Sequence, residues 1–314
     1  MNTIEIPDIA LVREIPSHWD EMSRDELTYC LDQVIMTSLG LISVTQCQVR
    51  CFYKIADVQR TWRSILWEYM MPESVVLEKN ANLVCLAREL TAFLFNNASD
   101  DESRVEINYD TIYNHLPEIT VFKWNVFPWI KLYGPADLLS DLTFGEFRAA
   151  LEEMQEYFDT KDEFALSKMI ACLYRPERKD YHKHVRSEDF DGLQRQPFNR
   201  NLIEQNARYT HKMGLVHRTA VLLWYSFTIG YIQREDLQIG GRTINLSPLF
   251  PRSSGEESKT RRPNGTGWTG LLYSIAKEGV FGNADQTDQT GLFDVLVYMY
   301  DQYQENQRLK RKSK

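Results

Sequence analysis

The stretch LTFGEFRAALEEMQEYF, residues Leu142 to Phe158, carries the clearest helix signal in the chain. Thr143 and Glu146 have the spacing of a capping box, in which two side chains satisfy each other's exposed backbone amides at a helix start. Beyond this start, Phe147, Leu151 and Met154 recur at helical spacing. The stretch therefore predicts an amphipathic helix with one buried face.

A second helical pattern, KDEFALSKMIACLYRP, follows at once. Thr160 and Glu163 repeat the capping-box spacing, and Pro176 ends the pattern because proline cannot continue a helix. The linker DTKD is short, so the two helices are expected to run antiparallel as a hairpin, with the rings and Met154 of the first packed on residues 164–173 of the second.

Helical patterns also occur on either side of this hairpin. Ser23 and Glu26 form another capping box, and further helices are expected in residues 45–70 (one or two), 80–95, 201–213, 219–234, 268–279 and 290–309. The apolar run 219–232 is shorter than the roughly 20 residues that span a bilayer, so it is expected to be a buried central helix.

Strand signals are fewer and shorter. Residues 105–110 and 118–135 are rich in β-branched and aromatic side chains, and Gly240 with Gly241 separates two β-prone arms, which is typical of a two-residue hairpin. The predicted fold is mainly α with a few short strands, built from helical hairpins in two packed halves.

A turn at Gly134 and Pro135 gives the predicted domain boundary. It separates a mainly helical N-terminal region, 1–134, from a helical C-terminal region, 135–314. Within the second region, the charged residues 177–200 are expected to run over the surface. The low-complexity residues 251–267 are expected to form a flexible internal loop.

Composition restricts the class of protein. The net charge of -8 argues against a general nucleic-acid binder, and the exception is the basic tail, where Lys310, Arg311 and Lys312 are candidate nucleic-acid contacts. The N-terminus lacks the basic and apolar regions of a signal peptide, so none is expected. With its longest apolar run too short to span a bilayer, the chain is not expected to have a membrane as partner. Five cysteines in apolar patterns suit a reducing compartment. The many large rings are expected mostly in cores, although they also serve as interface anchors.

Two groups of polar residues are candidates for a functional site. Glu152, Glu153 and Glu156 lie on one side of the first hairpin helix and are interpreted as a solvated or partner-facing acidic face. In an extended segment, Asp180, His182 and His184 of DYHKH would point to one side and could bind a divalent metal. The chain has none of the common nucleophile, phosphate-loop or dinucleotide motifs, and no cofactor is expected.

The segment YGPADLLSDLTFGEFRAALEEMQEYFDTKDEFALSKMIACLYRP, residues 133–176, resembles a group of phage and prophage proteins, many of them encoded in tail-morphogenesis regions. Residues 267–306 are similar in style to the C-terminal helices of that group. The resemblance implies a non-enzymatic assembly role, as a tail assembly chaperone or a minor structural component. It also implies other phage proteins, or a second copy, as partners, and a location in the host cytoplasm or the virion.

Three functional hypotheses follow. The first is an interaction protein that acts in phage or prophage assembly. The alternative is a metal-dependent hydrolase with Asp180, His182 and His184 as ligands and a glutamate as base. The third is nucleic-acid contact through the basic tail.

Overall fold

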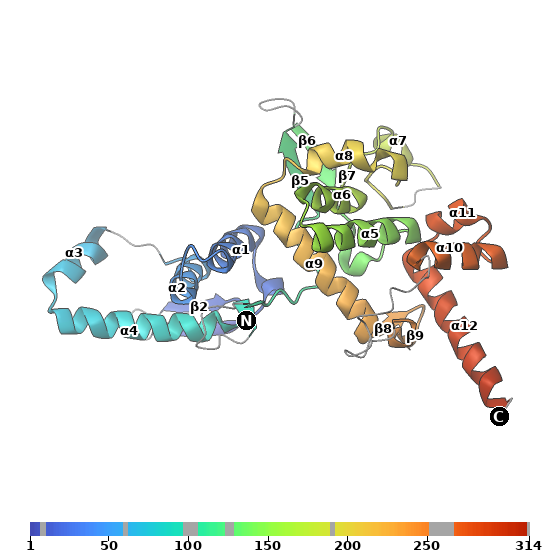
Figure 1. Cartoon of the computed structure of the whole chain (residues 1–314). Helices are drawn as coiled ribbons and strands as arrows, with labels where there is room; N and C mark the ends of the chain where they lie inside the picture. The colour runs from blue at the N-terminus through green and yellow to red at the C-terminus, as the bar shows by residue number, and fades with distance from the viewer. Residues whose placement is uncertain are drawn as a thin grey trace. The chain divides into compact units, whose positions relative to one another are not determined.

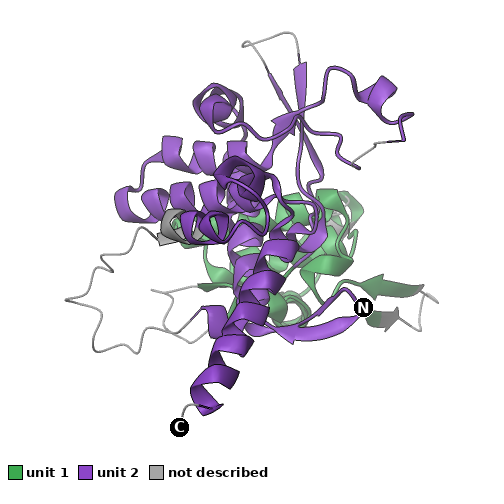
Figure 2. Ribbon diagram, turned by 90° about the vertical axis from the view of Figure 1, so that its right-hand side faces the viewer, with its two compact units in different colours: residues 1–111 green, residues 112–314 purple. Residues whose placement is uncertain are grey.

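The computed structural model describes residues 1–6, 11–58, 62–96, 106–122, 129–188, 192–250 and 267–312. Within these ranges the chain is mainly helical with short antiparallel strands, which confirms the predicted fold class (Figure 1). Contacts divide it into two compact units, Met1–Thr111 and Ile112–Lys314 (Figure 2). Of the predicted flexible loop, residues 251–266 lie outside the described part of the chain.

The first unit is built on helices. Its elements are the hairpin β1 (Asn2–Ile6) and β2 (Leu11–Ile15), the 3-10 turn η2 (Trp19–Glu21), helices α1 (Arg24–Ser38), α2 (Val44–Ile55), α3 (Trp62–Met70) and α4 (Glu73–Leu90), the turn η3 (Ala92–Leu94), and the paired strands β3 (Phe95–Asn96) and β4 (Glu106–Ile107).

The core of this unit lies between α1, α2 and the C-terminal half of α4. The predicted Ser23–Glu26 capping box is confirmed at the start of α1. Trp19 is fully buried, and its indole N–H donates to the carbonyl of Asn108, so the chain before α1 is fixed to the chain after α4. Helix α4 begins seven residues before the predicted start at Asn80. The apolar residues of its first two turns, Val75, Val76 and Leu77, are consecutive in the sequence and so show no helical period, and none of them is buried.

The second unit contains one three-stranded sheet among helices. Its elements are strands β5 (Glu118–Phe122), β6 (Trp129–Tyr133) and β7 (Arg175–Pro176), the turn η4 (Asp137–Leu139), helices α5 (Phe144–Thr160), α6 (Glu163–Leu173) and α7 (Tyr181–His184), the turn η5 (Arg200–Leu202), helices α8 (Ile203–Thr210) and α9 (Leu215–Arg234), the hairpin β8 (Asp236–Ile239) and β9 (Arg242–Asn245), the turn η6 (Ser247–Leu249), and helices α10 (Gly267–Glu278), α11 (Ala284–Gln289) and α12 (Leu292–Lys312).

The predicted helical hairpin is confirmed as α5 and α6, and α6 lies at the centre of the unit, packed against α5, α8 and α9. The N-terminal cap of α6 differs from the prediction. The Asp162 side chain, rather than Thr160, accepts the N–H of Phe164 at 2.9 Å, and Thr160 still belongs to α5. Lys161 adopts a left-handed backbone that ends α5, so only two residues join the helices.

The apolar run 219–232 lies within helix α9, as predicted, but only one side of this helix is buried, and α6 rather than α9 lies at the centre of the unit. No helix in the described residues is long and apolar enough to cross a membrane. The β8–β9 hairpin turns on Gly240 and Gly241, both with positive φ, which confirms the two-residue turn.

The boundary between the units falls at 111/112, rather than at Gly134 as predicted. The reason is a non-local strand pairing: β6 pairs with β5 on one side and with β7, which follows α6, on the other. The N–H of Gly134 also donates to Pro117 at 2.8 Å. Residues 112–134 therefore belong to the second unit.

Gly134→Ala is expected to destabilise the second unit by about 1–3 kcal/mol because the added methyl group overpacks the site. A Cβ there would lie 2.5 Å from the ring of Tyr174, which is held in place by hydrogen bonds from its hydroxyl to Asn114 and Leu116. The matched control is Gly230→Ala in α9, where the nearest atom belongs to the flexible end of Arg234. The control is expected to gain about 0.5–1 kcal/mol. Urea denaturation measures both; equal effects of the two changes would contradict the packing argument.

Candidate functional site

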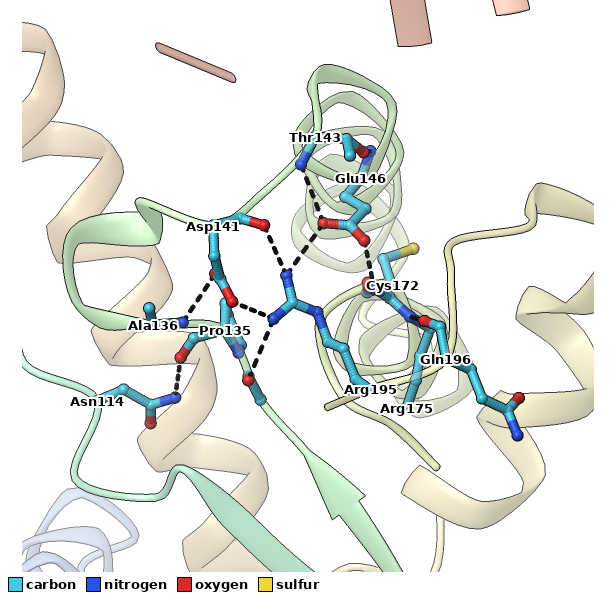
Figure 3. A network of polar contacts seen from close by, with 11 residues as sticks. Asn114, Pro135, Ala136, Asp141, Thr143, Glu146, Cys172, Arg175, Arg195 and Gln196 are labelled. Carbon is cyan, nitrogen blue, oxygen red and sulfur yellow. Dashed lines mark hydrogen bonds and ion pairs between the residues drawn. The ribbon is translucent and has the colours of Figure 1, made fainter. Parts of the chain in front are cut away.

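A buried cluster of charges surrounds the start of α5 (Figure 3). The predicted capping box is present: the Thr143 N–H donates to Glu146 Oε2 at 3.1 Å, and the Glu146 N–H donates to Thr143 Oγ1 at 3.3 Å. The Glu146 carboxylate has a second role that the sequence does not indicate, since it also forms ion pairs with Arg175 and Arg195. All three charged side chains are buried, with 1–2% of their surface exposed.

Further acceptors complete the cluster. Arg195 also pairs with the Asp141 carboxylate and donates to the Asp141 carbonyl at 2.9 Å. Arg175 donates to the carbonyls of Gln196, at 2.7 Å, and Cys172. Two arginines are thus balanced by two carboxylates, which is the condition for burying ionised groups.

At Arg195 alone the structure departs from the prediction that residues 177–200 run over the surface; the other described residues of this range are exposed or half-buried. The N–H of Arg178 donates to Gln194, and the N–H of Gln196 donates to Pro176, so the chain around Arg195 packs beside β7. A charged residue in a polar segment gives no local sign of burial, so the sequence offers no signal for this contact.

The two arginines differ in their electrostatics. Burial lowers the pKa of Arg175, although Glu146 opposes the shift. Burial also disfavours the charged form of Arg195. The attraction of Glu146 and the hydrogen bond to Asp141 outweigh this effect, so the pKa of Arg195 is raised. The cluster fixes the packing of α5, and both oxygens of Glu146 are occupied.

Helix α5 is also joined to the C-terminal helices. The Phe144 N–H donates to Thr290 at 2.9 Å, and the Leu292 N–H donates to Leu142 at 2.8 Å. Buried Arg148 pairs with Asp288 of α11 at 2.8 Å. A Cβ on Gly145 would lie 3.0 Å from Asp288, which accounts for a glycine in the first turn of α5.

The predicted partner-facing glutamates have cationic neighbours within the chain. Glu152 pairs with Arg148 and Arg200, while Lys168 of α6 lies between Glu153, at 3.2 Å, and Glu156, at 3.7 Å. Burial raises the pKa of Glu153. The role of these glutamates in partner binding stays a prediction, and a partner would have to compete with these ion pairs.

The geometry assumed for the metal site is wrong. Residues Tyr181–His184 form a helical turn, so side chains two residues apart point in different directions rather than to one side. A depression of 450 Å³ contains Asp180 but neither His182 nor His184. Among the described residues, no group of three or more His, Cys, Asp or Glu side chains is placed to hold a metal ion.

The basic tail continues α12 to Lys312, so Lys310, Arg311 and Lys312 occupy its last turn and are exposed. Cationic side chains stabilise a helix C-terminus through its dipole, which accounts for their position without a ligand. Nucleic-acid contact by these residues stays a prediction.

The five cysteines are free, and four of them are buried. Cys47 and Cys51 share one face of α2, as their spacing indicates, with sulfur atoms 3.9 Å apart. Burial raises the pKa of Cys172 well above its usual value, which argues against a nucleophilic thiolate there.

An open apolar surface lies in the first unit, on α3 and the first turns of α4. These helices extend beyond α1 and α2 (Figure 1). None of the side chains described in α3 is buried. Lys79 of α4 pairs with Glu68 at 2.5 Å and lies over the Trp67 ring, so that side of α3 faces α4. We call this helical pair the arm.

Another side of α3 carries an exposed apolar stripe. Its members recur at the i, i+3, i+4, i+7 spacing of one helix face and are exposed as follows: Trp62 69%, Ile65 53%, Leu66 48% and Tyr69 88%, followed by Met70 at 73%. These five residues are the α3 stripe. Scattered exposed apolar side chains are ordinary, but a contiguous stripe that includes Trp, Tyr and Met is typical of a protein interface. The sequence predicted core positions for most rings, and the α3 stripe is an exception.

Glu146→Ala is expected to destabilise the second unit by about 3–5 kcal/mol, because buried Arg175 loses its carboxylate partner and buried Arg195 loses one of its two. Glu156→Ala is the matched control on the same helix. Its carboxylate is exposed, and loss of such a pair changes stability by about 1 kcal/mol or less. Urea denaturation, with hydrogen exchange of α5 as a local readout, measures both variants. A Glu146→Ala protein as stable as the control would show that the buried cluster does not hold the unit together.

Comparisons with protein-family models, with curated protein sequences and with solved structures found no significant match to this chain.

Proposed function

We propose that the protein is a non-enzymatic assembly protein and that it binds another protein through the α3 stripe. The observation that carries this proposal is the exposure of two aromatic and three aliphatic or thioether side chains on one face of a short helix. Exposing such a face to water is unfavourable, and covering it releases about 25 cal/mol per Å² of apolar surface. Trp and Tyr are also the residue types that most often dominate binding energy.

The charged candidates support this assignment indirectly. Glu152, Glu153 and Glu156 already have intramolecular ion-pair partners, and the buried Glu146 cluster has no oxygen left for chemistry. The α3 stripe is different, because its described side chains are left in contact with solvent.

The resemblance of residues 133–176 to phage and prophage proteins gives the proposal its biological setting. We place the protein in phage or prophage assembly, as a tail assembly chaperone or a minor structural component. Its partners would then be other assembly proteins or a second copy of itself.

Photo-crosslinking tests the proposal directly. A photoreactive phenylalanine analogue at Tyr69, which is 88% exposed, is expected to give discrete adducts in cells that are producing particles. Leu66→Asp in the same chain is expected to abolish the adducts, because a carboxylate would be buried without a partner. Mass spectrometry identifies the protein attached.

The matched control places the same analogue at Tyr273 of α10, which is 62% exposed but lies outside the arm. Adducts with a second copy or with a different protein both support the proposal. If position 69 gives no more adduct than position 273, the α3 stripe is not a binding surface.

A further inference from the structure

We infer that the occupant of the α3 stripe is a second copy of this chain, with the two α3 helices packed antiparallel about a two-fold axis near Leu66. This inference rests on the proposed function and names the partner of the same surface. Three features of α3 support it: the area left uncovered, the placement of charge at its two ends, and the order of side chains along it.

The uncovered area suits a dimer. A buried aromatic side chain contributes about 150–250 Å². Because the five side chains of the α3 stripe are 48–88% exposed, together they offer several hundred Å². One side of a standard interface buries about 800 Å². The α3 stripe therefore supplies a substantial part of one side of such an interface.

Charge placement favours the antiparallel arrangement. Arg63 lies at the N-terminal end of α3, with its guanidinium 5.6 Å from the Trp62 ring. The C-terminal end of α3 carries the negative end of its helix dipole and leads to Glu73 at the start of α4, where the positive end of the α4 dipole offsets part of this negative charge. An antiparallel pair brings each Arg63 toward the acidic end of the other copy, whereas a parallel pair brings two Arg63 side chains together.

The order of side chains is also self-complementary. Leu66 lies at the middle of α3, with Trp62 four residues before it and Met70 four residues after it. A two-fold axis at Leu66 therefore places Trp62 of one copy against Met70 of the other. Contact between a thioether sulfur and an aromatic ring is favourable, and Met adapts its shape to the ring. A single short helix thus supplies both halves of the interface.

Sedimentation velocity on the full chain tests for the dimer. The wild-type protein is expected to be dimeric at micromolar concentration, and Leu66→Asp is expected to raise the dissociation constant at least about tenfold by burying a charge at the axis. Leu309→Asp in α12 is the control, since Leu309 is 57% exposed but lies outside the arm. Circular dichroism confirms that each variant is folded. A monomeric wild type, or a dimer that Leu66→Asp leaves unchanged, overturns the inference.

Oxidative crosslinking tests the orientation in a Cys85→Ser background, which removes the exposed native thiol. Leu66→Cys, next to the axis, is expected to form a disulfide-linked dimer. Met70→Cys is not, because the two copies of residue 70 would be about 12 Å apart along the helix axis. Equal crosslinking at both positions would indicate a parallel pair and contradict the antiparallel arrangement.

The two proposals fail in different ways. A photo-adduct with another protein and a monomeric wild type would leave the proposed function standing and remove the second copy as the partner. Absence of any adduct at Tyr69 would remove the binding surface itself.

Discussion

The Glu146 carboxylate holds together segments that are far apart in the sequence. One oxygen caps α5 through the Thr143 N–H and contacts Arg195, and the other accepts Arg175, which follows α6. Arg195 in turn reaches Asp141, just before the helix. The end of α6, the start of α5 and the chain near residue 195 therefore share one electrostatic centre. Removing any member would leave a buried charge uncompensated, which is far less favourable than losing an exposed pair.

A buried cluster of this kind specifies an arrangement more than it adds stability. An apolar replacement of similar volume can be as stable, because desolvation offsets much of the attraction between the charges. Apolar packing of α6 against α5, α8 and α9 supplies the main driving force of the second unit. The charges join the start of α5 to β7 and the 192–197 segment, and the same end of the helix contacts Thr290 and Asp288.

Structural features that depend on neighbouring residues could be predicted from the sequence, and those that depend on contacts between distant residues could not. The Ser23 and Thr143 capping boxes and the turn at Gly240 depend on residues three or fewer apart, so the sequence states them directly. The boundary at 111/112 depends on the β6–β7 pairing, and burial of Arg195 depends on acceptors about 50 residues away. The α3 stripe shows a third limit: an apolar helix face predicts burial, but it cannot state whether the covering surface belongs to the same chain.

The charged and the apolar surfaces of the protein differ in the free energy that binding would gain. The acidic face of α5, the most conspicuous candidate in the sequence, has its charges compensated by Arg148, Lys168 and Arg200. Binding there would first break existing ion pairs, and exposed pairs contribute little to affinity. The α3 stripe has no comparable cover among the described residues. Desolvating it gains free energy, and among the described contacts of its five side chains only that of the Arg63 guanidinium with the Trp62 ring would be disturbed. The physical gain from association is therefore larger on the arm than on the acidic helix.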